Sequence, residues 1–326
     1  MTLNQNEFLA NLMNLIVVTR VNSTTAGRRI NDLLDSVLVD TVEFGDGKLL
    51  ITADTLPVRD YSANSSLLTP QKPDVDEQLL TTTDKKIIEV TINRYLMAGA
   101  FANEYAMAEA IAMIESMLEK TKNIYNYKKA VSAYENWTPL DPEGAPVNED
   151  TQILEIDLID TENMTGPQLV ESEKANALKI YQAIRETSLS MQAPSREYNE
   201  INFEEMYNAE ELNLLVNSKF DTLINTYAIA SLFNSDKLNN IKIYDKSIII
   251  PSKQFTNEET REKTIGWLAS KYKYQIAPRF VLVTSFFDGS NLNLNEFLHM
   301  WLISGFARGL ACVKLVANYV PPVVEA

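Results

Sequence analysis

The sequence has 326 residues, of which 45% are hydrophobic and 9% aromatic, with only 10 glycines and 12 prolines. This composition excludes a mostly disordered or fibrous protein and suffices for one large body or two closely associated domains. The 29 basic and 44 acidic side chains give a formal net charge of −15. No basic arm offsets this charge, so sequence-specific binding of nucleic acid is not expected. Passive enclosure of nucleic acid remains compatible with this charge, because it does not require binding.

The first predicted elements are two helices, over residues 3–19 and 26–39. Alternating apolar residues then predict strands over 48–54 and 86–92. The span between them contains Pro57, Pro70 and Pro73 and few large apolar residues, so we predict an extended two-stranded arm. An isolated ribbon of this kind is marginal in water, and we expect it to become ordered by lying on a neighbouring subunit.

The longest predicted helix covers residues 103–125, where Met107, Ile111, Ile114 and Leu118 recur at helical spacing. A second long helix is expected from Pro167 to about residue 190, with Thr165 as its cap. Further strands are predicted at 152–158, 212–216, 241–250, 264–269, 279–285 and 305–317, with a helix at 219–233. Because helices and strands do not alternate regularly, the predicted fold class is α+β.

The residues that most often carry catalysis are scarce. The chain has one histidine, His299, and one cysteine, Cys312, so no disulfide can form within it and structural zinc is not expected. His299 lies in an apolar setting and is expected to be a packed or strand-borne residue. Cys312 is expected to be a buried small hydrophobic residue. We therefore predict no catalytic residue, no metal site and no cofactor.

Two glycine- or aspartate-containing stretches resemble ligand loops only superficially. Lys48 follows Gly45-Asp46-Gly47, but Leu49 stands where a phosphate loop has Ser or Thr, so a β-turn is expected. The stretch from Asp288 lacks the oxygen ligands of a calcium loop and is expected to be a polar turn that joins strands. The N-terminal apolar stretch 8–18 lacks the preceding positive charge of a signal peptide, and no membrane span is expected.

The acidic residues leave a choice of interpretation. Two clusters, Glu155, Asp157 and Asp160, and Asp74, Asp76 and Glu77, are candidates for the carboxylates of a hydrolase or for a solvated surface, and we favour the surface. Arg59 and Asp60, followed by Tyr61, lie on the predicted arm. An opposite-charge pair there is a candidate inter-subunit contact that fixes the register between subunits, with an ordinary surface pair as the alternative.

The order of these elements resembles that of the major capsid proteins of tailed bacteriophages, which share the Hong Kong 97 fold. Two segments are similar to head proteins of small podophages. One is Glu211-Leu212-Asn213-Leu214-Leu215-Val216-Asn217, followed by Lys219, Phe220 and Ala230-Ser231-Leu232-Phe233-Asn234. The other is the C-terminal stretch 297–318, with Trp301, Phe306, Arg308 and Ala311.

The resemblance implies a Hong Kong 97-like α+β fold in five parts. These are an N-terminal arm (1–40), an extended hairpin loop (41–93), a peripheral domain with the spine helix (94–195), an axial domain (196–290) and C-terminal strands that return to the peripheral domain (291–326). The N-terminal region is short for the scaffolding segment that some members carry. A separate scaffolding protein, or none, is therefore implied.

The resemblance also implies a function. We expect a structural head protein that forms hexamers and pentamers and closes into an icosahedral shell around double-stranded DNA, which it holds without sequence specificity. A portal is a further implied partner, no membrane is involved, and the virion would be assembled in the bacterial host cytoplasm. The alternatives are an encapsulin-like compartment, which uses the same fold to enclose a cargo enzyme, and a carboxylate-dependent hydrolase.

Overall fold

The computed structural model describes residues 31–42, 47–58, 71–93, 104–140, 143–145, 149–228, 247–288, 290 and 293–320. The chain divides into two compact units. Unit 1 comprises the residues up to Leu49, Leu79–Ala130 and Tyr274–Phe306, and unit 2 comprises Leu50–Gln78, Val131–Lys273 and the residues from Ala307. None of the described helices combines the length and apolar character needed to cross a membrane.

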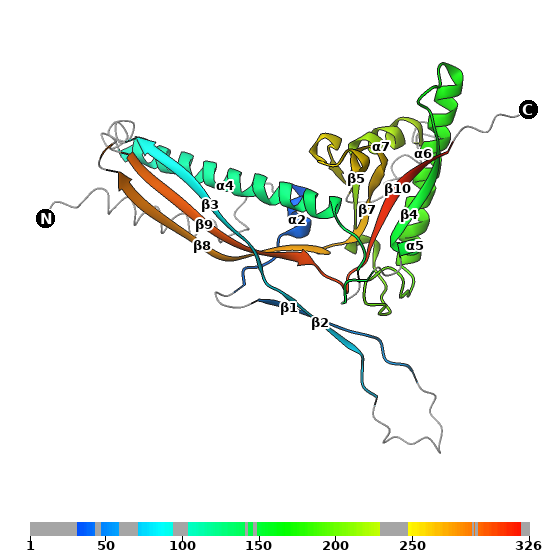
Figure 1. The fold of residues 1–326 in the computed structure, drawn as a ribbon, viewed down its shortest axis with the longest axis horizontal. Helices are drawn as coiled ribbons and strands as arrows, with labels where there is room; N and C mark the ends of the chain where they lie inside the picture. The colour runs from blue at the N-terminus through cyan, green and yellow to red at the C-terminus, as the bar shows by residue number, and fades with distance from the viewer. Residues whose placement is uncertain are drawn as a thin grey trace, which may run out of the picture. The chain divides into compact units, whose positions relative to one another are not determined.

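Unit 1 is built on a three-stranded antiparallel sheet in the order β3–β9–β8 (Figure 1). Its strands are β3 (Thr82–Asn93), β9 (Asn293–Phe306) and β8 (Tyr274–Asp288). The helix α4 (Glu104–Glu135) runs along one face of this sheet, and the short helix α2 (Asp32–Val37) packs against β8. The sheet and α4 therefore enclose an elongated core.

Alternation along β9 decides which side chains enter that core. Leu298, Met300 and Leu302 are fully buried on the face that α4 covers. Asp84 of β3, paired in register with Leu302, lies on the same face and is bound by Lys129 and by Tyr125 of α4. Burial and the nearby Asp84 carboxylate raise the pKa of Tyr125 to about 12, so the phenol remains a hydrogen-bond donor.

Glu296 is the exception among the inward-facing residues of β9. Its side chain is 1% exposed, and neither carboxylate oxygen has a hydrogen-bond partner among the residues that the structure describes. Burial raises its pKa from 4.5 to about 7, because the charged form cannot recover its lost hydration. The core of unit 1 therefore contains one acid that is more stable when protonated.

Unit 2 is built on a five-stranded mixed sheet in the order β4–β10–β7–β5–β6 (Figure 1). The strands are β4 (Ile153–Ile159), β10 (Cys312–Val320), β7 (Thr264–Ser270), β5 (Leu212–Asn217) and β6 (Ser247–Ile250). β10 is parallel to β4 and antiparallel to β7, while β5 is antiparallel to β7 and parallel to β6. All residues of the central strands β5 and β7 are buried.

Helix α6 (Pro167–Met191) covers one face of this sheet, where Ile180 and Ile184 join a buried hydrophobic cluster. Trp267 of β7 is fully buried between Tyr134 and Phe255, with ring centroids 6.0 and 5.8 Å away. Beside it, Gly266 is required for a close approach, because a Cβ atom there would lie 2.2 Å from the carbonyl oxygen of Leu215. The remaining elements of unit 2 are short: α5 (Glu149–Gln152), η1 (Ala209–Glu211), α7 (Ser218–Leu223), η2 (Ile224–Ala228), η4 (Ser252–Gln254) and α9 (Glu258–Lys263).

A buried ion pair links three loops of unit 2. Lys273 Nζ is 2.9 Å from Glu200 Oε1 and donates to the Leu310 carbonyl oxygen at 2.7 Å, and both charged side chains are almost completely buried. Trp137 Nε1 donates to the same Glu200 oxygen at 3.1 Å. Each buried charge is thus compensated by its partner, so removal of one side chain leaves the other buried without an opposite charge.

The structure confirms the α+β class and most predicted strands. It also confirms the long helix predicted at 103–125, which continues to Glu135, but it corrects the pairing of the arm. Residues 48–54 were expected to pair with 86–92, whereas β1 (Lys48–Ala53) pairs with β2 (Val75–Leu80) and β3 pairs with β9. β2 was not predicted, because the three consecutive polar residues Asp76-Glu77-Gln78 interrupt the apolar–polar alternation that identifies a strand.

Two further predictions were wrong in detail. The N-cap of α6 is Gly166, with a positive φ of 67°, rather than Thr165, and no side chain caps this helix. The predicted strand 305–317 is divided, because β9 ends at Phe306 and a turn precedes β10 at Cys312. The predicted helix at 3–19 and residues 241–246 lie outside the described residues.

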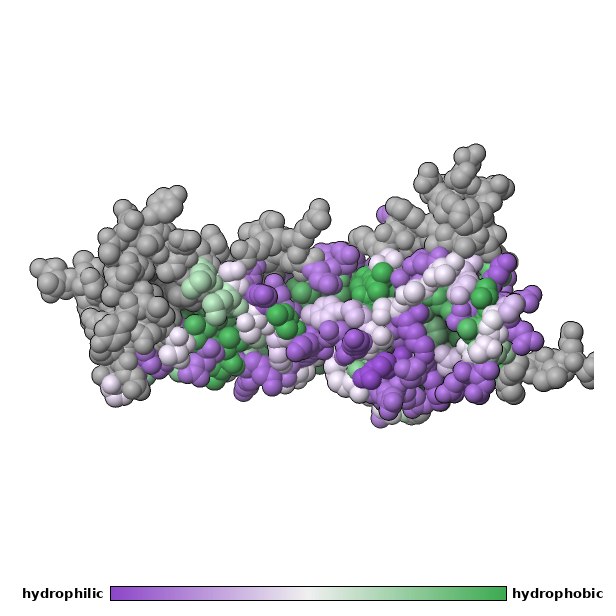
Figure 2. Space-filling view, turned by 90° about the horizontal axis from the view of Figure 1, so that it is seen from above, coloured by the Kyte–Doolittle hydropathy of each residue, from purple (hydrophilic) through white to green (hydrophobic). Residues whose placement is uncertain are grey.

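In the view of Figure 2, most of the coloured surface is hydrophilic and the hydrophobic side chains form separate patches. Within the core of unit 1, the buried Glu296 makes stability depend on pH. Glu296 takes up a proton on folding between pH 4.5 and about 7, so the free energy of unfolding should fall as the pH rises through that window. We expect the stabilising effect of Glu296→Met to grow by about 2 kcal/mol between pH 5 and pH 8 in urea unfolding.

Glu89→Met is the matched control, because Glu89 is an exposed glutamate on the same sheet. Its effect should not change with pH. Equal effects of Glu296→Met at the two pH values would contradict the assignment.

The buried ion pair gives a second prediction. Lys273→Met should lower the free energy of unfolding by about 3–5 kcal/mol, because the Glu200 carboxylate stays buried without its cation. Adding Glu200→Gln should recover a large part of this loss, since the amide still accepts from Trp137. A double-mutant cycle by urea unfolding measures the coupling, and additive effects would show that the pair is not coupled.

Candidate assembly interface

The two-stranded ribbon formed by β1 and β2 has one exposed side, which is mostly apolar, and one side that is partly buried. Along β1, Leu49 and Ile51 are 53% and 62% exposed, and along β2, Val75 and Leu79 are 49% and 60% exposed. The alternate residues of each strand are partly buried. Ala53 and the acidic Glu77 are exposed on the same side, and we call its four large apolar side chains the ribbon face. Exposed apolar side chains that gather on one strand pair are typical of a binding surface.

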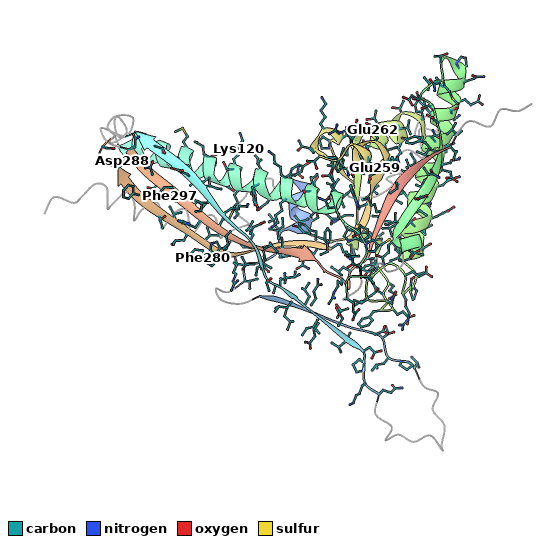
Figure 3. The ribbon with its side chains drawn as sticks, viewed as in Figure 1. Lys120, Glu259, Glu262, Phe280, Asp288 and Phe297 are labelled. Carbon is teal, nitrogen blue, oxygen red and sulfur yellow. The ribbon has the colours of Figure 1, made fainter. Side chains whose placement is uncertain are left out.

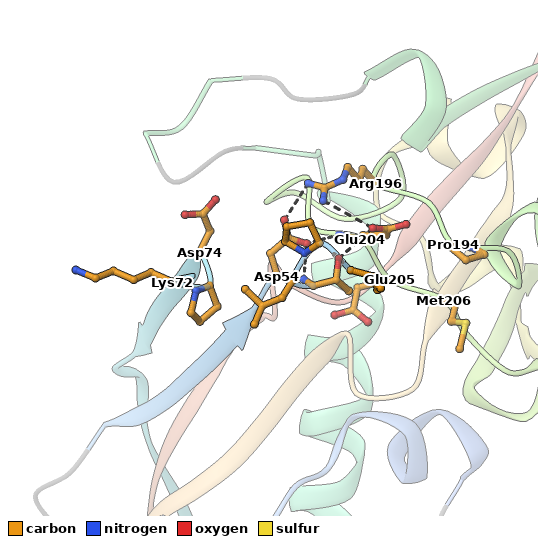
Figure 4. A pocket seen from close by; sticks show the side chains of 13 residues that line it. Asp54, Lys72, Asp74, Pro194, Arg196, Glu204, Glu205 and Met206 are labelled. Atoms are coloured by element: carbon orange, nitrogen blue, oxygen red, sulfur yellow. Dashed lines mark hydrogen bonds and ion pairs between the residues drawn. The ribbon is translucent and has the colours of Figure 1, made fainter. Parts of the chain in front are cut away.

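The end of β1 is fixed to the loop that follows α6. The carboxylate of Asp54 accepts from the backbone N–H of Glu204 at 3.0 Å and of Thr55 at 2.8 Å, and it pairs with Arg196 at 2.9 Å (Figure 4). Hydrogen bonding to the Glu204 backbone, with Arg196 nearby, keeps the pKa of Asp54 below its usual value. The contact is therefore made by a charged carboxylate at neutral pH.

β2 is fixed in the same way to the turn between β9 and β10. Arg308 Nη2 lies 3.2 and 3.3 Å from the two carboxylate oxygens of Asp76, and the Arg308 N–H donates to Gln78 Oε1 at 3.0 Å. Gly309 lies against Thr52 of β1, so closely that a Cβ atom would be 2.5 Å from the threonine hydroxyl. Polar side chains on one side of the ribbon hold it to unit 2 and leave the ribbon face free.

A cleft of about 970 Å³ lies beside this anchor, with Asp54, Asp74 and Glu205 among its lining residues (Figure 4). Burial and the Asp54 charge raise the pKa of Glu205. Asp54 already accepts three hydrogen bonds, so it is a structural acceptor. In the described part of the chain, no group of three acidic, His or Cys side chains has the geometry of a metal site.

The acidic clusters singled out in the sequence do not converge on one site. Asp76 pairs with Arg308, whereas its neighbour Glu77 is exposed, as alternation along β2 requires. Asp157 accepts from Asn318 at 2.8 Å, and Asp160 accepts from the Glu162 N–H at 3.0 Å. These carboxylates serve local structure, which favours the interpretation as surface over that of a hydrolase.

His299 and Cys312 lie where the sequence predicted. His299 is strand-borne on β9, and its Nε2 is 2.9 Å from Thr284 Oγ1 of β8. Cys312 is fully buried at the start of β10, and burial raises the pKa of its thiol to about 12. A thiol with this pKa is unreactive at neutral pH.

The predicted inter-subunit residues Arg59, Asp60 and Tyr61 lie outside the described residues. Of the residues that anchor the ribbon, the sequence pointed to Arg308 only through the similarity to podophage head proteins, and it gave no sign of either Arg196 or Arg308 as a partner of the ribbon. Each is far in sequence from its partner: Asp54 is 142 residues before Arg196, and Asp76 is 232 residues before Arg308. Only the tertiary structure brings these pairs together.

The fold is shared with solved phage capsids. The structure is similar to a capsid chain of Staphylococcus phage Andhra, with a TM-score of 0.60 and 10% sequence identity over 91% of this chain and 87% of that one. It is also similar to a chain of the cyanophage P-SCSP1u capsid, with a TM-score of 0.52 and 12% identity over 91% of this chain and 90% of that one. A chain of the Helicobacter pylori bacteriophage KHP40 head matches with a TM-score of 0.52 and 11% identity over 92% of this chain and 94% of that one. At this identity the similarity establishes the fold alone.

Sequence comparison establishes the family. No curated protein sequence matches the chain. A sequence model of the Phi29-like phage major capsid proteins matches residues 1–310, which is nearly the whole chain. The match favours a structural protein of the virion shell over an encapsulin-like compartment and over a hydrolase. The chain belongs to the Phi29-like phage major capsid protein family.

Proposed function

We propose that copies of this chain form hexamers and pentamers and close into an icosahedral shell around double-stranded DNA, with the ribbon face of each copy lying on an adjacent copy. The observation that carries the proposal is the two-sided ribbon. One side is fixed to its own subunit through Asp54 and Asp76, while the opposite side exposes four large apolar residues around Glu77. A strand pair built in this way is suited to hold a second molecule.

The energetics favour assembly through many weak contacts. Covering one half-exposed Leu or Ile side chain contributes about 1 kcal/mol, so a single ribbon face supplies a few kcal/mol. Such a contact is too weak to form stable dimers alone, but closure of a shell multiplies it through effective concentration. Growth is thereby restricted to geometries in which several contacts form together.

The other expected partners rest on the family relationship. We propose that the shell is assembled in the bacterial host cytoplasm with a separate scaffolding protein and a portal. The net charge of −15 would limit adhesion of the subunit to packaged DNA. The five-part division of the subunit, from the arm at 1–40 to the C-terminal strands at 291–326, remains a proposal for the assembled state.

The anchor predicts a loss of assembly without a loss of folding. Arg308→Ala leaves Asp76 without its partly buried partner, so the base of the ribbon should open more often. We expect faster amide hydrogen exchange in β1 and β2 and at least a fivefold lower yield of shells, measured by sedimentation and electron microscopy. Arg185→Ala is the control, because this exposed arginine of α6 makes, within the described part of the chain, a single weak contact of 3.5 Å with the Tyr181 hydroxyl. Equal yields for the two variants would contradict the role of the anchor.

The ribbon face predicts a sharper effect. Ile51→Lys places a charge in the proposed contact, where a partner would have to desolvate it, while the folded subunit keeps the side chain in water. We expect a subunit with an unchanged melting temperature that forms no rings or shells in electron micrographs. Leu189→Lys is the matched control, since Leu189 is 55% exposed on α6. Normal shells from Ile51→Lys would remove the ribbon face from the interface.

A further inference from the structure

One edge of the sheet in unit 1 is only partly covered. At the start of β8, the segment after α2 lies against its edge: Leu38 forms a bridge with Ile276, and the Val39 N–H donates to the Ile276 carbonyl at 3.2 Å. Farther along, within the described part of the chain, β9 is the only strand that pairs with residues 281–287. About half of the backbone N–H and C=O groups of this stretch therefore point away from the sheet.

The composition of this edge is unusual for a free one. The stretch Val281-Leu282-Val283-Thr284-Ser285-Phe286-Phe287 lies between Phe280 and Asp288 (Figure 3) and contains no charge, no proline and no glycine. Free edges in soluble proteins are usually protected by lysine, proline or a bulge. The bulge in β8 lies before this stretch, between Pro278 and Phe280. The edge is thus competent to pair with another strand.

The side chains of the edge point to the same conclusion. Leu282, Thr284 and Phe286 alternate on the face of the sheet opposite α4, where Leu282 and Phe286 are 40% and 63% exposed. Thr284, midway between them, is held by the contact of its hydroxyl with His299 Nε2 at 2.9 Å. Two exposed apolar residues therefore flank a fixed polar one at equal spacing.

We infer that this edge of β8 pairs with the same edge of a second copy, antiparallel about a two-fold axis that passes through Thr284. This register places Leu282 against Phe286 of the partner subunit, and Phe286 against Leu282 of the partner subunit, so that each covers the other. A stretch without charge is self-complementary, since no like charges face each other across the axis. The seven residues give a seam of about 24 Å. The inference rests on the proposed function in that the pairing would serve as one contact of the shell.

A cysteine on the axis tests the register directly. Thr284→Cys would bring two copies of residue 284 opposite each other with Cβ atoms about 5 Å apart, close enough for a disulfide after small adjustment. We expect oxidation to convert most of this variant into a disulfide dimer on non-reducing gels. The native Cys312 is buried and should not contribute. The control is Ile87→Cys, which is 61% exposed on the same face but lies on β3 at the other edge. Dimer no more abundant for Thr284→Cys than for Ile87→Cys would overturn the inference.

A charge exchange tests the same axis without a covalent bond. Thr284→Lys and Thr284→Glu each place two like charges opposite each other, and each variant alone should yield at least tenfold fewer shells. Co-expression of the two should restore the yield, because Lys then faces Glu, and this recovery also shows that both variants fold. Normal assembly of either variant alone, or no recovery in the mixture, would overturn the pairing.

The two proposals fail differently. Wild-type shells together with no cross-link at residue 284 would leave the proposed function intact and refute the β8 seam. Absence of rings and shells from the wild type, with or without its scaffold, would refute the proposed function. In that case the cross-link of the free subunit in solution still decides whether β8 self-pairs.

Discussion

The interaction on which the rest of the account depends is the attachment of one side of the ribbon to its own subunit. Asp54 and Asp76 lie on the inward side of β1 and β2 and are held by Arg196 and Arg308. Because successive side chains of a strand point to opposite faces, fixing one side determines the direction of the other. The four apolar side chains of the ribbon face, together with Glu77, therefore point away from the anchored side.

This arrangement explains how a marginal element can serve assembly. A two-stranded ribbon is too small to be stable alone. Its base does not depend on a neighbour, because backbone hydrogen bonds, two arginines and the close approach of Thr52 to Gly309 hold it. The sequence interpretation, in which the whole arm is ordered only by an adjacent copy, is therefore too strong for the base. It stays a prediction for residues 59–70, which include the candidate contact Arg59, Asp60 and Tyr61.

Much of the fold could be predicted because its signals are local. The spacing of Met107, Ile111, Ile114 and Leu118 indicated α4, and the alternation in 86–92 indicated β3, because each pattern repeats within a few residues. Strand partners could not be predicted in this way. β3 pairs with β9, more than 200 residues away, and β2 was hidden by the same Asp76 that anchors it. The anchoring role of the two arginines could not be predicted either, since a surface arginine is common and its carboxylate partner lies more than 140 residues away in the sequence.

The most direct test of the central claim is a cryo-EM map of the assembled shell at side-chain resolution. We expect that Leu49, Ile51, Val75 and Leu79 of each subunit are covered by an adjacent copy while Asp54 and Asp76 keep their pairing with Arg196 and Arg308. A shell in which these four side chains face solvent, or in which the ribbon detaches from both arginines, would contradict it.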